Sequence, residues 1–136
     1  MEKRLFEMIM QIRKNCLRTE EKIRKNLCLT PGEFNGLLSI EPGEKISGTI
    51  FSQRMVLSPS RGSRVIGKLS KNGYIAMNIV PHNRRSVEAS LTPKGIAMQK
   101  QLETSMGECE GKITSKLAPE QTEEIKRSLK LLIDVM

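Results

Sequence analysis

The stretch from Leu57 to Gly73, LSPSRGSRVIGKLSKNG, constrains the fold of this chain more than any other. Ser58 can cap a helix by accepting a hydrogen bond, and Pro59 suits the first helical position because its missing N–H would have no partner there. The Asn72-Gly73 pair supplies a left-handed stop at the other end. The stretch therefore predicts one short helix whose two ends are fixed by its sequence.

The predicted helix has two faces of different chemistry, because residues three and four apart share a side. One face is apolar and consists of Gly62, Val65, Ile66 and Leu69. The other face is cationic and consists of Arg61, Arg64, Lys68 and Lys71, with Ser60 and Ser63 beside it. Such a helix can lie in the major groove of DNA, although a solvated surface face is the simpler interpretation of the helix considered alone.

The net charge of the chain is concentrated around this helix. The formal net charge of the 136-residue sequence is +8, and residues 45–94 contain nine basic residues and one acidic residue. The two flanks together contribute no net charge. A basic block of this kind favours a polyanion as the partner. A membrane surface is disfavoured because the block lacks a long amphipathic helix with large apolar residues on one side.

The composition disfavours several other classes of protein. The chain has three Phe, one Tyr and no Trp, which disfavours a single-strand binder that stacks bases on aromatic rings. No apolar run approaches the length of a membrane span, and the N-terminus lacks a signal-peptide core. Cys16, Cys28 and Cys109 lack metal-binding spacing, and the simplest interpretation makes them reduced, small core residues of a cytosolic protein.

A long helix is predicted over residues 2–26. Its apolar residues recur at steps of three and four, and charged residues fill its other sides. The apolar stripe consists of Leu5, Ile9, Ile12, Cys16, Ile23 and Leu27. A stripe of this length must be buried against another surface.

A helix-turn-helix is predicted between residue 30 and the end of the cationic helix. Thr30 and Glu33 form a capping box that starts one helix, and Ser47 is the expected cap of the next, from Gly48 to about Met55. The residues expected to point inward are Phe34, Leu37 and Leu38 in the first helix and Ile50, Phe51 and Met55 in the second. This second helix and the cationic helix, joined by a tight turn, give the helix-turn-helix pattern.

A β-hairpin is predicted directly after the cationic helix. One strand covers residues 74–80, and the other covers residues 86–91, with Val87, Ala89 and Leu91 on one face at a period of two. The expected tip is cationic and consists of Pro81, His82, Asn83, Arg84 and Arg85. An ordinary solvated turn is one interpretation of this tip. The position behind a cationic helix-turn-helix favours a wing whose arginines enter the minor groove.

Two helices are predicted after the hairpin. Thr92 and Pro93 begin one of them, and Pro119 begins the other. The apolar stripe of the first consists of Ile96, Leu102, Met106, Cys109, Ile113 and Leu117. The inner side of the second consists of Ile125, Leu129, Leu132 and Met136.

In its predicted helix-turn-helix, hairpin and flanking helices, the sequence resembles the MarR family of multiple antibiotic resistance regulators. Three blocks carry the resemblance, in the order of the family and close to its spacing: LTPGEFNGLL from Leu29, SPSRGSRVIGKLSKNG from Ser58 and NRRSVEASLTPKG from Asn83. The resemblance implies a mainly α (α+β) fold. Within it, residues 29–94 would form a winged helix-turn-helix DNA-binding domain, and residues 1–28 and 95–136 a helical dimerisation element.

The resemblance also implies a homodimer on double-stranded DNA with a pseudo-palindromic operator. Recognition helices would lie in adjacent major grooves and wings in the minor grooves. The cationic surfaces and the resemblance together give these expected DNA-contacting residues: Ser58, Ser60, Arg61, Ser63, Arg64, Lys68, Asn83, Arg84 and Arg85. Of the basic residues, Lys68, Lys71 and Arg54 are expected to neutralise backbone phosphates. Asn83 stands where the family usually has Asp, so it offers the wing arginines less charge assistance.

Regulation by a small ligand or by cysteine oxidation is a further implication of the family. Its peroxide sensors carry a reactive cysteine near the start of the first helix. Cys16 lies too close to the Leu29-Thr30 motif to match that position. The sensing role is therefore not transferred to this chain, and no ligand-binding residues are legible in the sequence.

The sequence predicts a sequence-specific transcriptional regulator, by default a repressor that a small ligand or an oxidant releases from DNA. A winged helix used for protein–protein contact and a DNA-binding factor without an effector are the alternatives. An enzyme is not expected, because no nucleophile is paired with a base and no cofactor or metal motif is present. The expected location is the cytoplasm of a bacterium or archaeon, in association with the nucleoid.

Overall fold

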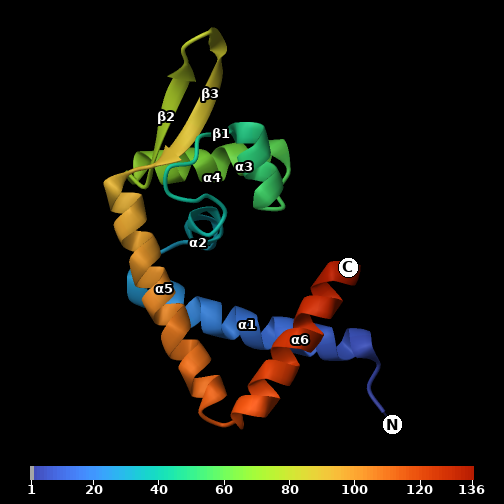
Figure 1. The fold of residues 1–136 in the computed structure, drawn as a ribbon. Helices are drawn as coiled ribbons and strands as arrows, with labels where there is room; N and C mark the ends of the chain where they lie inside the picture. The colour runs from blue at the N-terminus through green and yellow to red at the C-terminus, as the bar shows by residue number, and fades with distance from the viewer. Residues whose placement is uncertain (1) are drawn as a thin grey trace. The chain divides into compact units, whose positions relative to one another are not determined.

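The computed structural model describes residues 2–136, and for residues 83–86 it describes the backbone alone. The described residues form six helices and three short strands (Figure 1). In chain order these are α1 (Leu5–Leu27), α2 (Pro31–Leu37), β1 (Ile46–Ser47), α3 (Gly48–Arg54), α4 (Pro59–Lys71), β2 (Ile75–Val80), β3 (Asn83–Leu91), α5 (Pro93–Thr114) and α6 (Pro119–Val135). The predicted mainly α fold with a hairpin after the cationic helix is confirmed.

The chain divides into two compact units within α5. The first unit ends at Leu102, and the second runs from Glu103 to Met136. The first unit holds helices α1 to α4, the sheet and the start of α5. The second unit holds the rest of α5 and α6.

The helix ends in the first unit are fixed by local hydrogen bonds, as the sequence predicts. The Thr30 hydroxyl accepts from the Glu33 amide, and the Glu33 carboxylate accepts from the Thr30 amide, each at 3.1 Å. Ser47 caps α3 by accepting from the amide of Ile50 at 3.2 Å. Each cap satisfies backbone N–H groups that have no partner inside the helix.

The three strands form one antiparallel sheet in the order β1-β3-β2. The register pairs Ile75 with Leu91 and Met77 with Ala89, so the hairpin begins immediately after α4. The short β1 pairs with the other edge of β3 and leads directly into α3. The sheet therefore joins the wing to the helix-turn-helix.

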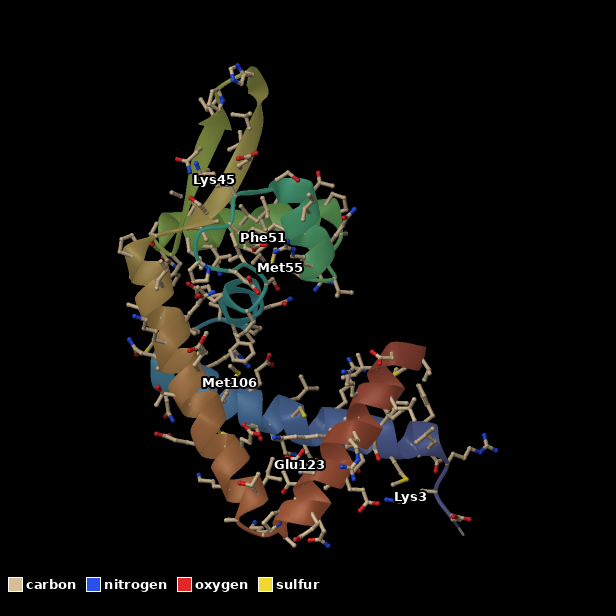
Figure 2. All side chains as sticks on the ribbon, viewed as in Figure 1. Lys3, Lys45, Phe51, Met55, Met106 and Glu123 are labelled. Carbon is tan, nitrogen blue, oxygen red and sulfur yellow. The ribbon has the colours of Figure 1, made fainter. Side chains whose placement is uncertain are left out.

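The core of the first unit lies where the helix-turn-helix meets the sheet. Phe51, Leu69 and Ala89 are fully buried, from α3, α4 and β3 respectively. Figure 2 shows Phe51 and Met55 at the centre of this unit. The other core residues are Ile23, Leu29, Phe34, Leu37, Ile40, Ile46, Ile66, Tyr74, Ile75 and Leu102.

Several residues expected to be buried are exposed. Leu38, the C-cap of α2, is 48% exposed, and Ile50 is 45% exposed on α3. Val87 is 38% exposed, whereas its face-mate Ala89 is buried. The predictions of an inward Leu38 and a buried Ile50 are therefore wrong.

The stripe of α1 and the cysteines also differ from expectation. Ile23 is the buried member of the α1 stripe, and Leu5 and Ile12 are more than half exposed. Cys16 and Cys28 are exposed and Cys109 is half-buried, so a core position is wrong for the first two.

The helices after the hairpin begin where the sequence predicts. The Thr92 hydroxyl accepts from the amide of Gly95 at 3.1 Å at the start of α5. Leu102 is buried, but Ile113 is 61% exposed and Leu117 lies beyond the end of α5. Helix α6 begins at Pro119 and buries none of its residues.

Candidate nucleic-acid interface

Helix α4 presents its two faces as its sequence predicts. Gly62, Ile66 and Leu69 are buried, and Val65 is half-buried. The polar face is exposed and consists of Ser60, Arg61, Ser63, Arg64, Lys68 and Lys71. Ser58 begins the helix by accepting from the amide of Arg61 at 3.3 Å. The helix thus carries a solvent-facing cationic surface on a buried apolar base.

Close contact with α3 holds the first turns of α4. A Cβ atom on Gly62 would lie 1.9 Å from Oγ and 2.5 Å from Cβ of Ser52, a buried residue of α3. Real side chains do not approach so closely, so only glycine allows the two helices to meet here. Gly62 therefore fixes where α3 crosses α4.

Close contact with α2 holds the middle of α4. A Cβ atom on Gly32 would lie 2.9 Å from Val65, and one on Gly36 would lie 2.4 Å from Leu69. These small residues admit the apolar side chains of α4 to the surface of α2. The contact is apolar and gives close packing rather than directional bonds.

A buried carboxylate joins α2 to the end of α4. Glu33 is 4% exposed, and its Oε2 accepts from Nδ2 of Asn72, the C-cap of α4, at 2.8 Å. Burial by itself raises the pKa of Glu33, but hydrogen bonds from Asn72 and Thr30 favour the ionised form. Their combined effect is larger, so the pKa lies below its ordinary value of 4.5.

The root of the wing is tied to both α4 and α5. Lys94 Nζ donates to the carbonyl of Asn72 at 2.6 Å and lies 4.8 Å from the centre of the Tyr74 ring. The Thr92 hydroxyl donates to the carbonyl of Gly73, and the Thr92 amide donates to the carbonyl of Tyr74. The hairpin therefore leaves α4 in a fixed direction.

Arg54 of α3 forms an ion pair within the protein, whereas the basic side chains of α4 form none among the described residues. Both terminal nitrogens of Arg54 donate to the Glu44 carboxylate, at 2.7 and 2.9 Å, so its charge is already paired. In the part of the chain that the structure describes, no acidic side chain forms an ion pair with Arg61, Arg64, Lys68 or Lys71. The exposed charge of α4 is therefore available to an external anion, whereas that of Arg54 is satisfied within the protein.

The tip of the wing is shorter than the sequence predicts. The turn consists of Pro81 and His82, and β3 already begins at Asn83. The register pairs Ile79 with Val87 but Val80 with Asn83, so residues 84–86 interrupt the pairing. The side chains of Asn83, Arg84 and Arg85 lie outside the described residues, and their expected contacts with DNA stay predictions.

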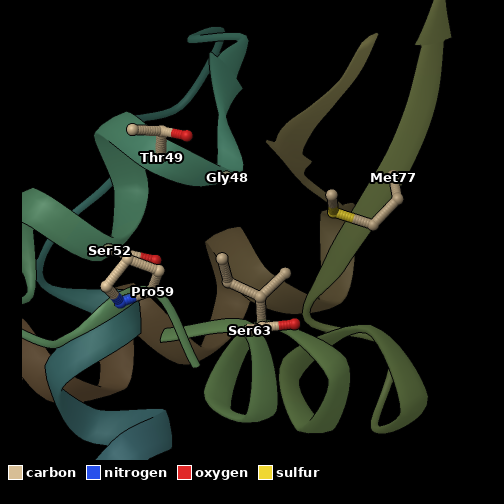
Figure 3. Close-up of a pocket in the computed structure, with 7 residues that line it drawn as sticks. Gly48, Thr49, Ser52, Pro59, Ser63 and Met77 are labelled. Atoms are coloured by element: carbon tan, nitrogen blue, oxygen red, sulfur yellow. The ribbon is translucent and has the colours of Figure 1, made fainter. Parts of the chain in front are cut away.

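A pocket of about 280 Å³ adjoins α4 on the side of the sheet (Figure 3). Its lining comes from α3, α4 and β2 and includes Ser52, Ser63 and Met77. Ser63 is also one of the expected DNA-contacting residues. The pocket therefore opens beside the cationic surface.

The polar contact between Glu33 and Asn72 is not predicted by the sequence pattern. The pattern predicts a capping box at Glu33 and a helix stop at Asn72, and both are present. The two residues are 39 positions apart, so no local spacing indicates that they meet. The contact between Gly62 and Ser52 was missed for the same reason.

Two other kinds of site are not found among residues 2–136 as described. No group of three or more His, Cys, Asp and Glu side chains is placed to hold a metal ion. No helix of the described chain has the length and apolar character needed to cross a membrane.

Comparisons with known proteins give relatives that match most of this chain in sequence or in structure. No protein-family model matches the chain. An HTH-type transcriptional repressor of Mycobacterium tuberculosis is 27% identical over 106 residues, which cover 78% of this chain and 76% of that protein.

Solved structures resemble almost the whole chain. A crystal structure of a cysteine-to-serine mutant of MarR from E. coli has a TM-score of 0.86 and 19% identity, and the match covers 98% of each chain. A mutant of MepR from S. aureus, bound to an oligodeoxyribonucleotide, has a TM-score of 0.67 and 17% identity, over 99% of this chain and 100% of that one. The chain therefore has the winged-helix fold of MarR, which confirms the resemblance to the MarR family that its sequence shows.

Proposed function

We propose that this protein is a DNA-binding transcriptional regulator that reads double-stranded DNA with α4. The observation that carries the proposal is the exposed cationic face of α4, whose arginines and lysines form no ion pair among the described residues. Within this face, the charge of Lys68 also helps to lower the pKa of Glu33. The names of the mycobacterial relative and of the oligonucleotide-bound MepR support the same class of function. We refer to α4 below as the recognition helix.

Arginines near the start of the recognition helix are the proposed base readers. Arg61 and Arg64 lie one turn apart on the exposed face, where a guanidinium can donate two hydrogen bonds to O6 and N7 of guanine. Ser60 and Ser63 are placed to contact bases or phosphates beside them. Lys68 and Lys71, further along the helix, are proposed to neutralise backbone phosphates.

The wing is proposed to contact the minor groove next to the recognition helix. Arg84 and Arg85 supply the charge that a narrow minor groove attracts. The fixed root of the hairpin at Thr92 and Lys94 supports a wing that keeps one direction relative to α4. The wing would thereby extend the contact beyond the base pairs that α4 reads.

The chain is proposed to act as a homodimer built from its terminal helices. On α1, Leu5, Phe6 and Met8 are more than half exposed. On α6 and its C-cap Met136, the exposed apolar residues are Ile125, Leu129, Leu131, Ile133, Val135 and Met136. Apolar helix faces of this size are covered in stable proteins, and a second copy of the chain would cover them symmetrically.

Release from DNA by a small ligand or an oxidant remains part of the proposal. The pocket beside Ser63 supports the ligand route, because a molecule bound there would lie next to the groove-facing residues. Cys28 is exposed and lies outside the apolar stripe of α1, so its thiol is accessible to an oxidant. Repression is the expected outcome of binding, since a bound dimer would block polymerase at a promoter.

Selection from random duplex DNA tests the proposed function. Sequencing of the bound duplexes is expected to give a pseudo-palindrome with half-sites about 10 base pairs apart, as two recognition helices of a dimer require. The affinity for the selected site should fall steeply with salt concentration, because released counterions drive binding. A phenolic acid or an oxidant added to the same binding assay tests release.

A protein-binding winged helix would give a different result. It would enrich no sequence from the pool and would show no steep dependence of DNA affinity on salt. A shuffled version of the selected duplex is the control for non-specific binding. A factor without an effector would bind DNA as proposed but would not respond to either added compound.

A further inference from the structure

We propose that Glu33 and Asn72 form a positioning clamp that sets the angle of the recognition helix on DNA. The inference rests on the proposed function, since it concerns how α4 reads DNA. Neither residue is expected to touch DNA. Glu33 and Asn72 would act by holding the helix that carries Arg61 and Arg64.

The clamp connects two elements through a carboxylate with both oxygens engaged. Oε1 of Glu33 accepts from the amide of Thr30 at 3.1 Å, which fixes the carboxylate to the start of α2. Oε2 accepts from Nδ2 of Asn72 at 2.8 Å, which reaches the end of α4. Glu33 is 4% exposed, so its carboxylate depends on these bonds, whereas Asn72 at the helix end is exposed.

The end of α4 is held from a second direction as well. Lys94, at the start of α5, donates to the carbonyl of Asn72 at 2.6 Å. The Asn72 amide donates to the carbonyl of Lys68 at 2.9 Å and so completes the last turn of the helix. One residue thus receives contacts from α2, α4 and α5.

The helix is consequently fixed at two separated points. Gly62 meets Ser52 at a contact that admits no Cβ atom, and this contact acts as a pivot near the start of the helix. Asn72 lies ten residues further on, a distance of about 15 Å along the axis. A pivot alone would leave the helix free to tilt and roll, and the clamp removes that freedom.

The contacts between pivot and clamp add no hydrogen bond between α2 and α4. Gly32 against Val65 and Gly36 against Leu69 are apolar contacts that set how closely the two helices approach. A shift of about 1 Å at the clamp would tilt the axis by about 4°, given the ~15 Å between the two points. Bidentate hydrogen bonds to a base edge tolerate such errors poorly, whereas phosphate contacts through long lysine side chains tolerate them well.

The proposal therefore predicts a loss of specificity rather than a general loss of DNA affinity. Asn72→Asp places a second carboxylate against Glu33 and breaks the clamp. The ratio of affinities for the selected site and for random duplex is expected to fall about tenfold or more, the value of one good base contact. The affinity for random duplex should fall less than the affinity for the selected site, because the added negative charge weakens phosphate attraction on both duplexes and cancels in the ratio.

A second substitution should restore the hydrogen bond of the clamp, with the donor now at position 33 and the acceptor at position 72. In the double variant Glu33→Gln, Asn72→Asp, the amide of the new glutamine can donate to the new aspartate. Its oxygen can still accept from Thr30 and keep the capping box. The specificity ratio of the double variant is expected to return to within about threefold of the original, a difference of less than one good base contact.

Gln99→Met provides the matched control for a loss of stability alone. Gln99 donates to the carbonyls of Leu37 and Ile40, each at 2.7 Å, and links α5 to α2 and the turn after it. The variant should lower the thermal midpoint without changing the specificity ratio. All affinities are measured well below the thermal midpoint of each variant, with circular dichroism to confirm the fold.

Two results would overturn the clamp. One is an Asn72→Asp variant whose specificity ratio matches that of the original protein. The other is a double variant, Glu33→Gln, Asn72→Asp, whose specificity ratio stays as low as that of Asn72→Asp. If the original protein itself selects no DNA sequence, the proposed function fails instead, so the two failures are distinguishable.

Discussion

At the scale of single residues, some side chains of α4 pack in the core and others face solvent. Ile66 and Leu69 are buried in the core, whereas Arg61 and Arg64 are exposed and have no acidic partner in the described chain. A charge without an internal partner costs the fold little when it is removed. Substitutions on the exposed face should therefore report on DNA binding alone.

Arg64→Ala is expected to weaken binding to the selected site by about 1–3 kcal/mol and to relax the base preference at one position. The physical reason is the loss of a bidentate contact to a guanine edge. Titration of labelled duplexes that differ at single positions measures both effects. Arg18→Ala, an exposed arginine of α1 with the same change of charge, is the control. Equal weakening on every duplex would show that Arg64 contacts only phosphate.

Glu33→Gln is expected to change how stability depends on pH. The folded state lowers the pKa of Glu33, so the ionised carboxylate stabilises the protein above its ordinary pKa of 4.5. That stabilisation is lost as the pH falls through the lowered pKa. Urea unfolding from pH 7 down to pH 3 should show the advantage of the original protein over the variant shrinking toward acid. A constant difference would contradict the assigned pKa shift.

At the scale of the elements, glycine positions decide how the recognition helix packs. Gly62 and Gly67 are in the same helix and five residues apart, but their surroundings are opposite. A Cβ atom at Gly62 would collide with Ser52, whereas one at Gly67 would meet no atom within 4 Å. The same substitution should therefore have opposite effects at the two positions.

Gly62→Ala is expected to destabilise the protein by about 1–3 kcal/mol, because backbone or side chain must shift to admit the methyl group. Gly67→Ala, the matched control, is expected to stabilise it by about 0.5–1 kcal/mol through its higher helix propensity. Chemical denaturation measures both changes. Equal effects of the two substitutions would contradict the close contact between α3 and α4.

The sequence predicts these elements well where local chemistry determines them. The caps at Thr30, Ser47 and Ser58 form as predicted, because each hydrogen bond joins residues three positions apart. The inward positions of Leu38 and Ile50 are wrong because periodicity shows which residues share a side, but not how far the neighbouring element extends. The Glu33–Asn72 contact depends on how α2 packs against α4. Neither the capping motifs nor the periodicity of apolar residues gives that information.

At the scale of the whole molecule, the terminal helices leave apolar side chains exposed. Ile12 of α1 is 51% exposed and Ile133 of α6 is 71% exposed. The sequence predicts that the α1 stripe is buried, and within the single chain most of it is not. A second copy supplies the missing surface in the proposed homodimer.

Ile12→Glu is expected to shift the protein from dimer to monomer, because a charge would be buried at the proposed interface. Analytical ultracentrifugation measures the change, and binding to the two half-sites should lose its cooperativity. Gln11→Glu adds the same charge at the neighbouring exposed position and serves as the control. An unchanged mass for Ile12→Glu would exclude this part of α1 from the interface.

The separation of the two faces of α4 also bears on how a regulator of the proposed kind would acquire a new operator. Ser60, Arg61, Ser63 and Arg64 are exposed, and the side chains of the two arginines have no ion-pair partner among the described residues. Mutations there can accumulate after gene duplication without lowering the stability of either copy. During this divergence, the buried residues and the Glu33–Asn72 contact keep α4 in one orientation. Operator preference can therefore diverge between duplicated regulators while the scaffold stays under a separate selection for folding.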